Sequence, residues 1–158
     1  MDQILRNNDT ECSVDINKML ESARGMIGAK WRHQGRKPWA VDCIGLVIVS
    51  FKEGGITIRD HKNYGREPWK DGLDIHLTEH FGERLPLNEM REGDIVVMKW
   101  PEQPAPAHVG IITNHPLGGL AVIHSYSQIS VTEHRIDSGW LSLMCHIYRP
   151  DWFVDGGT

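Results

Sequence analysis

The sequence predicts an α+β domain, in which N-terminal helices pack on a C-terminal antiparallel β-sheet. Apolar residues in the first third of the chain recur at helical spacing, and the hydrophobic period changes to two after about residue 94. Helices followed by consecutive strands are typical of α+β domains. The 158 residues, 40% of them hydrophobic, suit one domain, which we expect over 14–158 after a polar leader at 1–13.

Three helices are predicted. Asp15 caps the first, whose apolar stripe ends at Gly28. The second covers Cys43–Glu53; its Val and Ile residues favour a strand, but its length and the following Gly54-Gly55 favour a buried helix. A short third helix is expected near Leu73–Phe81.

The rest of the chain is predicted to be strands and loops. We expect loops over 30–40 and 56–70 and a turn at 91–94. The strands alternate in hydrophobicity and are separated by Pro- and Gly-rich connections. They are Ile95–Trp100, His108–Asn114, Leu120–Tyr126, Ile129–Arg135 and Leu143–Arg149.

Charge and composition exclude several classes of function. The net charge is −4 with no basic run, which argues against binding of nucleic acid or anionic lipid. No apolar stretch approaches the roughly 20 residues of a membrane span, and the N-terminus lacks the apolar core of a signal peptide. We therefore expect synthesis in the cytoplasm and no membrane insertion. The three cysteines, Cys12, Cys43 and Cys145, are odd in number and far apart, so at least one thiol is expected to be free.

Cys43 is the candidate nucleophile. It follows Asp42 where a polar loop gives way to the predicted second helix. The positive end of a helix dipole favours the thiolate, which is the reactive form of cysteine. Backbone N–H groups of a first helical turn lack intrahelical partners and can bind an oxyanion. Asp42 either caps the helix only, or caps it and also binds a substrate ammonium group.

Two histidines on neighbouring predicted strands complete the candidate site. His108 opens its strand, with Gly110 on the same face leaving the surface beside it open for a substrate. A hairpin centred on Pro116 would put His124 opposite His108, with Cβ atoms about 5 Å apart. A loop of odd length satisfies this pairing. We predict that His108 is the general base and that His124 fixes its orientation and tautomer.

Other interpretations of these residues remain open. Cys43 could be a buried structural cysteine, and His108 and His124 could be hydrogen-bonded sheet residues. A thiolate and two imidazoles also suit zinc, although the nucleophilic interpretation explains the helix start better. The H-x-x-E-H pattern at 76–80 is typical of a zinc protease, but a solvated helix face is favoured. Cys145-His146 are adjacent on a strand and point to opposite faces. We expect no metal or organic cofactor.

The chain resembles the NlpC-type cell-wall cysteine peptidases, a papain-like superfamily, over about residues 16 to 149. Three blocks carry the resemblance. They are Gly28-Ala29-Lys30-Trp31-Arg32-His33-Gln34-Gly35 with Asp42-Cys43-Ile44-Gly45-Leu46-Val47, then Arg91-Glu92-Gly93-Asp94-Ile95-Val96 with Ala107-His108-Val109-Gly110-Ile111, then Val122-Ile123-His124-Ser125. The resemblance implies catalysis by Cys43, His108 and His124. It implies substrate contacts at Asp42, at Trp31 (commonly tyrosine in the family) and at Ile44 (serine in many members).

The segment Arg32-His33-Gln34-Gly35-Arg36 is most similar to the branch found in the tails of phages and gene transfer agents. That resemblance implies hydrolysis of peptide-stem amide bonds in peptidoglycan, which opens the wall for DNA entry. It also implies a place in the tail of a phage or phage-like particle, with tail hub or tail-tip proteins as partners. The alternatives are a catalytically idle structural protein of the tail tip, and an acyl-hydrolase or transferase of the same superfamily.

Overall fold

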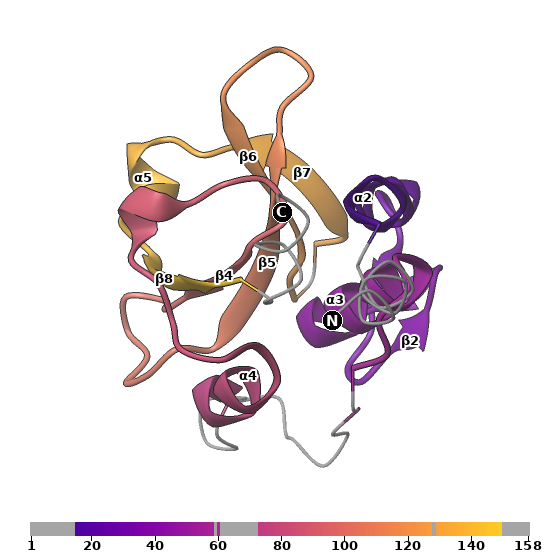
Figure 1. Ribbon diagram of the computed structural model, residues 1–158, viewed down its shortest axis with the longest axis horizontal. Helices are drawn as coiled ribbons and strands as arrows, with labels where there is room; N and C mark the ends of the chain where they lie inside the picture. The colour runs from indigo at the N-terminus through magenta and orange to yellow at the C-terminus, as the bar shows by residue number, and fades with distance from the viewer. Residues whose placement is uncertain (1–14, 59, 61–72, 128, 150–158) are drawn as a thin grey trace, which may run out of the picture.

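The computed structural model confirms the α+β fold, with helices packed on one antiparallel sheet (Figure 1). It describes residues 15–58, 60, 73–127 and 129–149. The predicted polar leader at 1–13, with Cys12, lies outside the described residues, as does most of the predicted irregular region at 56–70.

The predicted helices are present. They are α2 (Ile16–Gly25), α3 (Cys43–Glu53) and α4 (Leu73–Phe81). Asp15 caps α2 as expected, and that helix ends three residues before Gly28, which has a φ of 93°. The bounds of α3 and α4 coincide with the prediction. Favourable caps and buried apolar faces therefore outweigh the strand propensity of Val and Ile in α3.

The predicted loop over 30–40 contains a small sheet. Its strands are β1 (Lys30–Trp31), β2 (Arg36–Lys37) and β3 (Ala40–Val41), in the order β1-β3-β2. Strands of two residues are too short to show a period of two in the sequence, so the prediction missed them.

The main sheet has the order β7-β6-β5-β4-β8, and all its pairs are antiparallel. Each strand lies within two residues of its predicted bounds. The strands are β4 (Ile95–Met98), β5 (His108–Asn114), β6 (Leu120–Ser125), β7 (Val131–Arg135) and β8 (Met144–Tyr148). Two short helices, the 3-10 helix η2 (Leu87–Glu89) and α5 (Ser138–Leu141), were not predicted.

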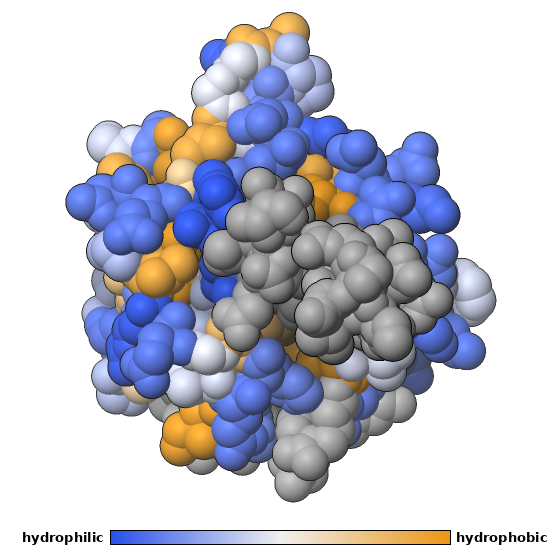
Figure 2. Space-filling model, in the orientation of Figure 1, coloured by the Kyte–Doolittle hydropathy of each residue, from blue (hydrophilic) through white to orange (hydrophobic). Residues whose placement is uncertain are grey.

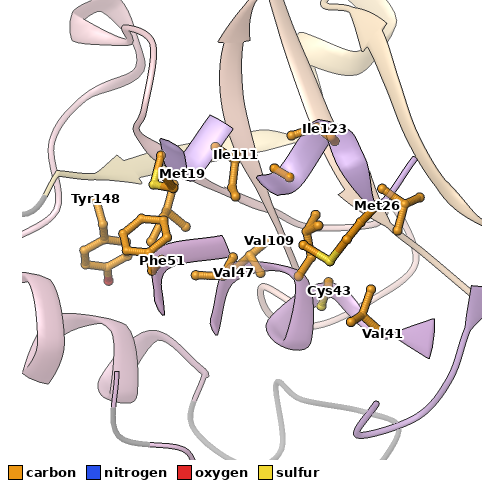
Figure 3. Packing of buried hydrophobic residues seen from close by; sticks show 14 of the residues in the cluster. Met19, Met26, Val41, Cys43, Val47, Phe51, Val109, Ile111, Ile123 and Tyr148 are labelled. Carbon is orange, nitrogen blue, oxygen red and sulfur yellow. The ribbon is translucent and has the colours of Figure 1, made fainter. Parts of the chain in front are cut away.

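Alternation along the strands divides the apolar residues between two cores. Ile95 and Val97 join the first core, which includes residues of α2 and α3 (Figure 3), while Val96 and Met98 join a second core. Cys43 belongs to the first core. Figure 2 shows small separate apolar patches among polar residues on the visible face. In the part of the chain that the structure describes, no helix has the length and apolar character needed to cross a membrane.

Candidate active site

The candidate nucleophile, Cys43, is the first residue of α3 and is 7% exposed (Figure 3). Burial, followed by the charge of Asp42, raises the pKa of the thiol to about 12, and backbone N–H groups, that of Val109 first among them, lower it only in part. The sequence predicted that the helix start would favour the thiolate. The backbone N–H groups of Cys43 and Ile44 do lower the thiol pKa, as predicted, but desolvation disfavours the charged form more strongly, so the thiol keeps its proton in the resting structure.

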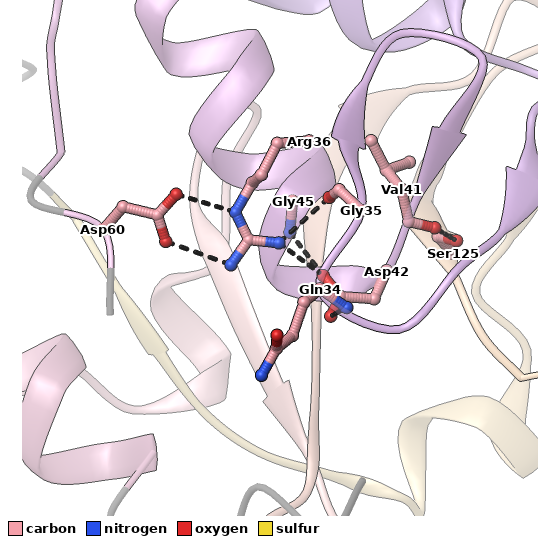
Figure 4. Close-up of polar contacts among 8 residues, drawn as sticks. All are labelled: Gln34, Gly35, Arg36, Val41, Asp42, Gly45, Asp60 and Ser125. Carbon is pink, nitrogen blue, oxygen red and sulfur yellow. Dashed lines mark hydrogen bonds and ion pairs between the residues drawn. The ribbon is translucent and has the colours of Figure 1, made fainter. Parts of the chain in front are cut away.

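Asp42 is buried in a network of hydrogen bonds (Figure 4). Its Oδ1 accepts from the backbone N–H of Gly45 at 2.8 Å and from Nη1 of Arg36 at 3.2 Å. Its Oδ2 accepts from the backbone N–H of Gln34 at 2.8 Å. Arg36 also donates to Asp60 at 2.8 Å. Asp42 therefore caps α3, and both of its oxygens already accept from protein groups; its contact with a substrate remains a prediction.

Two glycines let the loop before the nucleophile lie directly on the first turn of α3. A Cβ atom at Gly45 would clash with the backbone oxygen of Gly35. A Cβ atom at Gly35 would in turn clash with the backbone of Ala40. The close approach fixes the position of Asp42 and Cys43 relative to this loop.

The other two predicted substrate-binding residues have different surroundings. Trp31 is half-buried and stacks on His33, with ring centroids 6.4 Å apart. Ile44 is half-buried and packs against the first core. The substrate contacts of both residues remain predictions.

His108 and His124 are joined by a hydrogen bond of 2.7 Å between Nε2 of the first and Nδ1 of the second. His108 is 4% exposed and His124 is fully buried. Burial lowers the pKa of His108 to about 3. Burial, with the charges of His108 and His134 after it, lowers the pKa of His124 to about 2. Both rings are thus neutral at physiological pH, and the Cys43 thiol keeps its proton.

The predicted register of the two strands is wrong by two residues. Ile111 pairs with Ile123, and continuing this register puts His124 opposite Gly110, with His108 on the diagonal. The turn is centred on Leu117 rather than Pro116, because glycines with positive φ at 118 and 119 close it. The predicted odd loop length is confirmed, so both histidines stay on one face.

Gly110 does not leave an open surface for a substrate, as the sequence suggested. A Cβ atom there would lie 2.6 Å from Cγ2 of Val122 and 3.2 Å from Cβ of His124. The space above this glycine is filled by β6, so its missing side chain makes room for Val122 and His124.

The sequence interpretation missed a third histidine, His134 of β7. Its Nε2 lies 2.8 Å from Nε2 of His124, and its Nδ1 lies 3.0 Å from the backbone oxygen of Arg135. His124 pairs with Thr132, which makes His134 its diagonal neighbour on the same face. The sequence held a signal for it: in the predicted strand 129–135, His134 lies two residues after Thr132 and so shares its face of the sheet, the face of His124.

Aromatic rings surround this row of histidines and were missed as well. Trp100 lies 5.2 Å from His108, and Tyr126 stacks on His124 at 4.8 Å, both measured between ring centroids. Trp140 lies 5.1 Å from His124 and 4.4 Å from His134. These rings exclude water, which is the cause of the lowered pKa values of the buried imidazoles.

Cys43 and the histidine rings lie on different sides of the sheet, and the start of α3 approaches the backbone at the start of β5. Cys43 belongs to the first core, whereas the histidine rings lie with Trp140, which packs against the second. Val109, whose N–H lowers the thiol pKa, directly follows His108. The buried Ser125 hydroxyl donates to the backbone oxygen of Val41 at 2.7 Å (Figure 4), which joins the two sides again.

The arrangement of possible metal ligands does not support the alternative zinc interpretations. Within the described ranges, no group of three His, Cys, Asp or Glu side chains is arranged to hold a metal ion. In the H-x-x-E-H segment of α4, Nδ1 of His76 lies 3.8 Å from Oε1 of Glu79. Cys145 is exposed and His146 is buried against Asp74, at 2.8 Å, on the opposite face of β8.

A surface groove of about 760 Å³ runs along the loop that precedes the nucleophile. Its lining includes basic side chains, those of Lys30, Arg32, Arg36 and Lys37. Cys43 and His108 are not part of its lining, so the groove adjoins the candidate site without containing it.

Comparison with solved structures shows the same fold in several proteins. A protein similar to an NLP/P60-family lipoprotein from Staphylococcus aureus has a TM-score of 0.60 and 15% identity, over 85% of this chain and 41% of its own. An NlpC/P60 family protein from Bacillus cereus has a TM-score of 0.60 and 16% identity, over 87% and 40%. The NlpC/p60 domain of the peptidoglycan hydrolase SagA has a TM-score of 0.58 and 18% identity, over 86% and 99%.

The chain spans about 40% of the length of the first two of these proteins. No curated protein matches it in sequence. The family model of NlpC/P60 matches residues 28–149, which include Cys43, His108 and His124. The chain therefore belongs to the NlpC/P60 family.

Proposed function

We propose that this protein is a cysteine peptidase that hydrolyses amide bonds in the peptide stems of peptidoglycan. Cys43 is the nucleophile, His108 is the general base and His124 orients it. The observation that carries the proposal is the approach of the Cys43 thiol, at the first residue of α3, to the backbone N–H of Val109, which directly follows His108, whose ring is bonded to His124. Membership of the NlpC/P60 family, and the shared fold with the peptidoglycan hydrolase SagA, support the substrate class.

Because both groups are neutral at rest, the proton has to pass from Cys43 to His108 as the new bond to the substrate forms. His108 uses Nε2 for His124, so Nδ1 is the nitrogen left for the thiol. As Nδ1 takes the proton of Cys43, Sγ forms a bond to the amide carbon and the carbonyl oxygen becomes an oxyanion. The N–H groups of Cys43 and Ile44, at the first turn of α3, are the donors available to this oxyanion.

The second half of the reaction returns the site to its starting state. The imidazolium of His108 gives its proton to the leaving amine, the C–N bond breaks, and a thioester on Cys43 remains. A water molecule then gives a proton to His108 and adds its oxygen to the thioester carbon. The C–S bond breaks, the thiolate regains the proton, and the products are a carboxylic acid and an amine.

The finer biological setting is part of the same proposal. The Arg32-His33-Gln34-Gly35-Arg36 segment supports a place in the tail tip of a phage or gene transfer agent, where the particle carries the enzyme to the wall. Its partners would be tail hub or tail-tip proteins. Electron microscopy of purified particles labelled with an antibody against this chain tests the location, and labelling away from the tail would contradict it.

The activity is tested by mass spectrometry of purified peptidoglycan fragments. Wild type and the matched control Cys145→Ala, which removes an exposed free thiol, should both release new stem-peptide products. Cys43→Ala should release none while keeping the circular dichroism spectrum and melting temperature of a folded protein. Products from Cys43→Ala at the wild-type level would overturn the proposal. No product from wild type would favour the idle structural protein.

A further inference from the structure

The row of three histidines ends on a backbone carbonyl, and this fixes the positions of its protons. Nδ1 of His134 lies 3.0 Å from the oxygen of Arg135. A carbonyl oxygen only accepts hydrogen bonds, so Nδ1 of His134 carries a hydrogen. When the ring is neutral it has only this one N–H, which leaves Nε2 of His134 as an acceptor.

The same rule assigns the next two rings in turn. Nε2 of His124, at 2.8 Å from the acceptor on His134, is the donor of that bond. Nδ1 of His124 is then an acceptor, so the 2.7 Å bond from Nε2 of His108 is donated by His108. His108 therefore has its hydrogen on Nε2 and a bare lone pair on Nδ1. This is the one neutral tautomer that can take a proton from Cys43.

We propose that His134 is a positioning residue that, through His124, holds His108 in the tautomer able to act as a base toward Cys43. The inference rests on the proposed function, since it assigns the state of the same general base. A donor in place of the acceptor at position 134 would reverse every bond in the row. His108 would then carry its hydrogen on Nδ1 and could not accept the proton of the thiol.

The surroundings of His134 favour this assignment over simple packing. Its ring lies 4.4 Å from that of Trp140, between centroids, which fixes its plane. The ring is half-buried, so the row leads from the fully buried His124 toward the surface. A ring that served only to fill space would not need both of its nitrogens at hydrogen-bond distance from an acceptor and from His124.

Nitrogen NMR of the labelled imidazoles tests the assignment without any substrate. At mildly alkaline pH, the chemical shifts and ring couplings should show Nε2–H for His108 and His124 and Nδ1–H for His134. Finding Nδ1–H on His108 would overturn the inference. Because the tautomers are read from the free protein, this failure is separate from a failure of the proposed peptidase activity.

Two substitutions test the consequence for turnover. His134→Gln keeps an acceptor and should retain kcat within about threefold, whereas His134→Lys offers only donors and should lower kcat by about 10²-fold or more. KM should stay unchanged in both, since both ring nitrogens of His134 are bonded within the protein and the residue acts through His124. His115→Gln, in the exposed turn between β5 and β6, is the control and should match wild type. Equal kcat for the two variants would overturn the inference; if the lysine variant fails to fold, the NMR result decides.

Discussion

The two halves of the candidate site hold their geometry with different chemistry. Around the nucleophile, the buried carboxylate of Asp42 binds Arg36 and backbone N–H groups. Around the candidate base, neutral imidazoles and aromatic rings hold the geometry, and His108 is bonded to His124. Among the described residues, no carboxylate is bonded to either of these two rings. The first half is charged and lies against the helices. The second is uncharged and lies on the other side of β5.

This difference adds to the effect of burial on the protonation state of the resting site. Burial raises the thiol pKa, with the charge of Asp42 as a smaller cause, and burial lowers the pKa of His108, which has no anion bonded to it. A preformed thiolate–imidazolium pair would need the opposite arrangement, with the anion beside the histidine. Neither Cys43 nor the two histidines therefore carries a charge at rest, and in the proposed mechanism the proton moves from Cys43 to His108 as the bond to substrate forms.

The pH dependence of Cys43 alkylation tests most directly whether the resting site is neutral. With the thiol pKa near 12 instead of the ordinary 9.0, the thiolate fraction at neutral pH is about 10³-fold lower than in the unfolded chain. Iodoacetamide should therefore modify Cys43 much more slowly in the native protein than in urea. The rate should still rise at alkaline pH. Peptide mapping by mass spectrometry measures the rate.

Cys145 serves as an internal reference in the same experiment, because it is an exposed free thiol. Native and unfolded rates should differ less for Cys145 than for Cys43. A rate for native Cys43 that is high and independent of pH in mildly acidic solution would show a preformed ion pair and refute the neutral resting state.

The loop at Gly35 packs closely on α3, so a substitution there can disrupt the charged half of the site, around Asp42, without touching the histidines. In Gly45→Ala, the added Cβ atom meets the backbone oxygen of Gly35, so the loop that binds Asp42 has to move. We expect a loss of about 3 kcal/mol in the free energy of unfolding, typical of overpacking, and loss of turnover. Urea denaturation measures the first effect. Gly25→Ala, with no atom within 4 Å of the added Cβ, should leave stability and activity near wild type.

The neutral half should make the fold sensitive to acid. The pKa of His108 falls from 6.5 to about 3 and that of His124 from 6.5 to about 2, so the unfolded chain binds more protons than the native one below pH 6.5. Their contribution to stability is complete above pH 6.5 and declines as the pH falls toward these values. The slope approaches about 1.4 kcal/mol per pH unit for each histidine.

Urea titrations between pH 6.5 and about 5, where most carboxyl groups stay ionised, would measure this slope. The matched comparison is His108→Gln with His124→Gln, in which both titrating groups are gone. The double variant should show a flatter dependence on pH whatever its absolute stability. An unchanged slope would mean that the two imidazoles are not neutral in the native state.

The two halves also differed in how far the sequence could predict them. The bounds of α3, the cap at Asp42 and the position of Cys43 depend on neighbouring residues, so local patterns were sufficient. That His108 and His124 share one face of the sheet depends only on the odd length of the loop between their strands, and it was predicted. Their register was wrong by two residues, because it depends on which glycines close the turn. His134 was missed because its role appears only once β7 is paired with β6.

The hydrogen bond from Ser125 to Val41 joins the two halves, and its removal tests whether their alignment affects turnover. The bond is buried and measures 2.7 Å, and the oxygen of Val41 keeps a second donor, the N–H of Arg32 at 3.3 Å. Ser125→Ala should therefore lose only about 1 kcal/mol of stability. Ser50→Ala removes an equally buried 2.7 Å bond inside α3 and should lose a similar amount. Only Ser125→Ala should also lower kcat, by several-fold, because the strand before the nucleophile is then free to shift against β6. Equal kcat values in the two variants would mean that the first core alone aligns the halves.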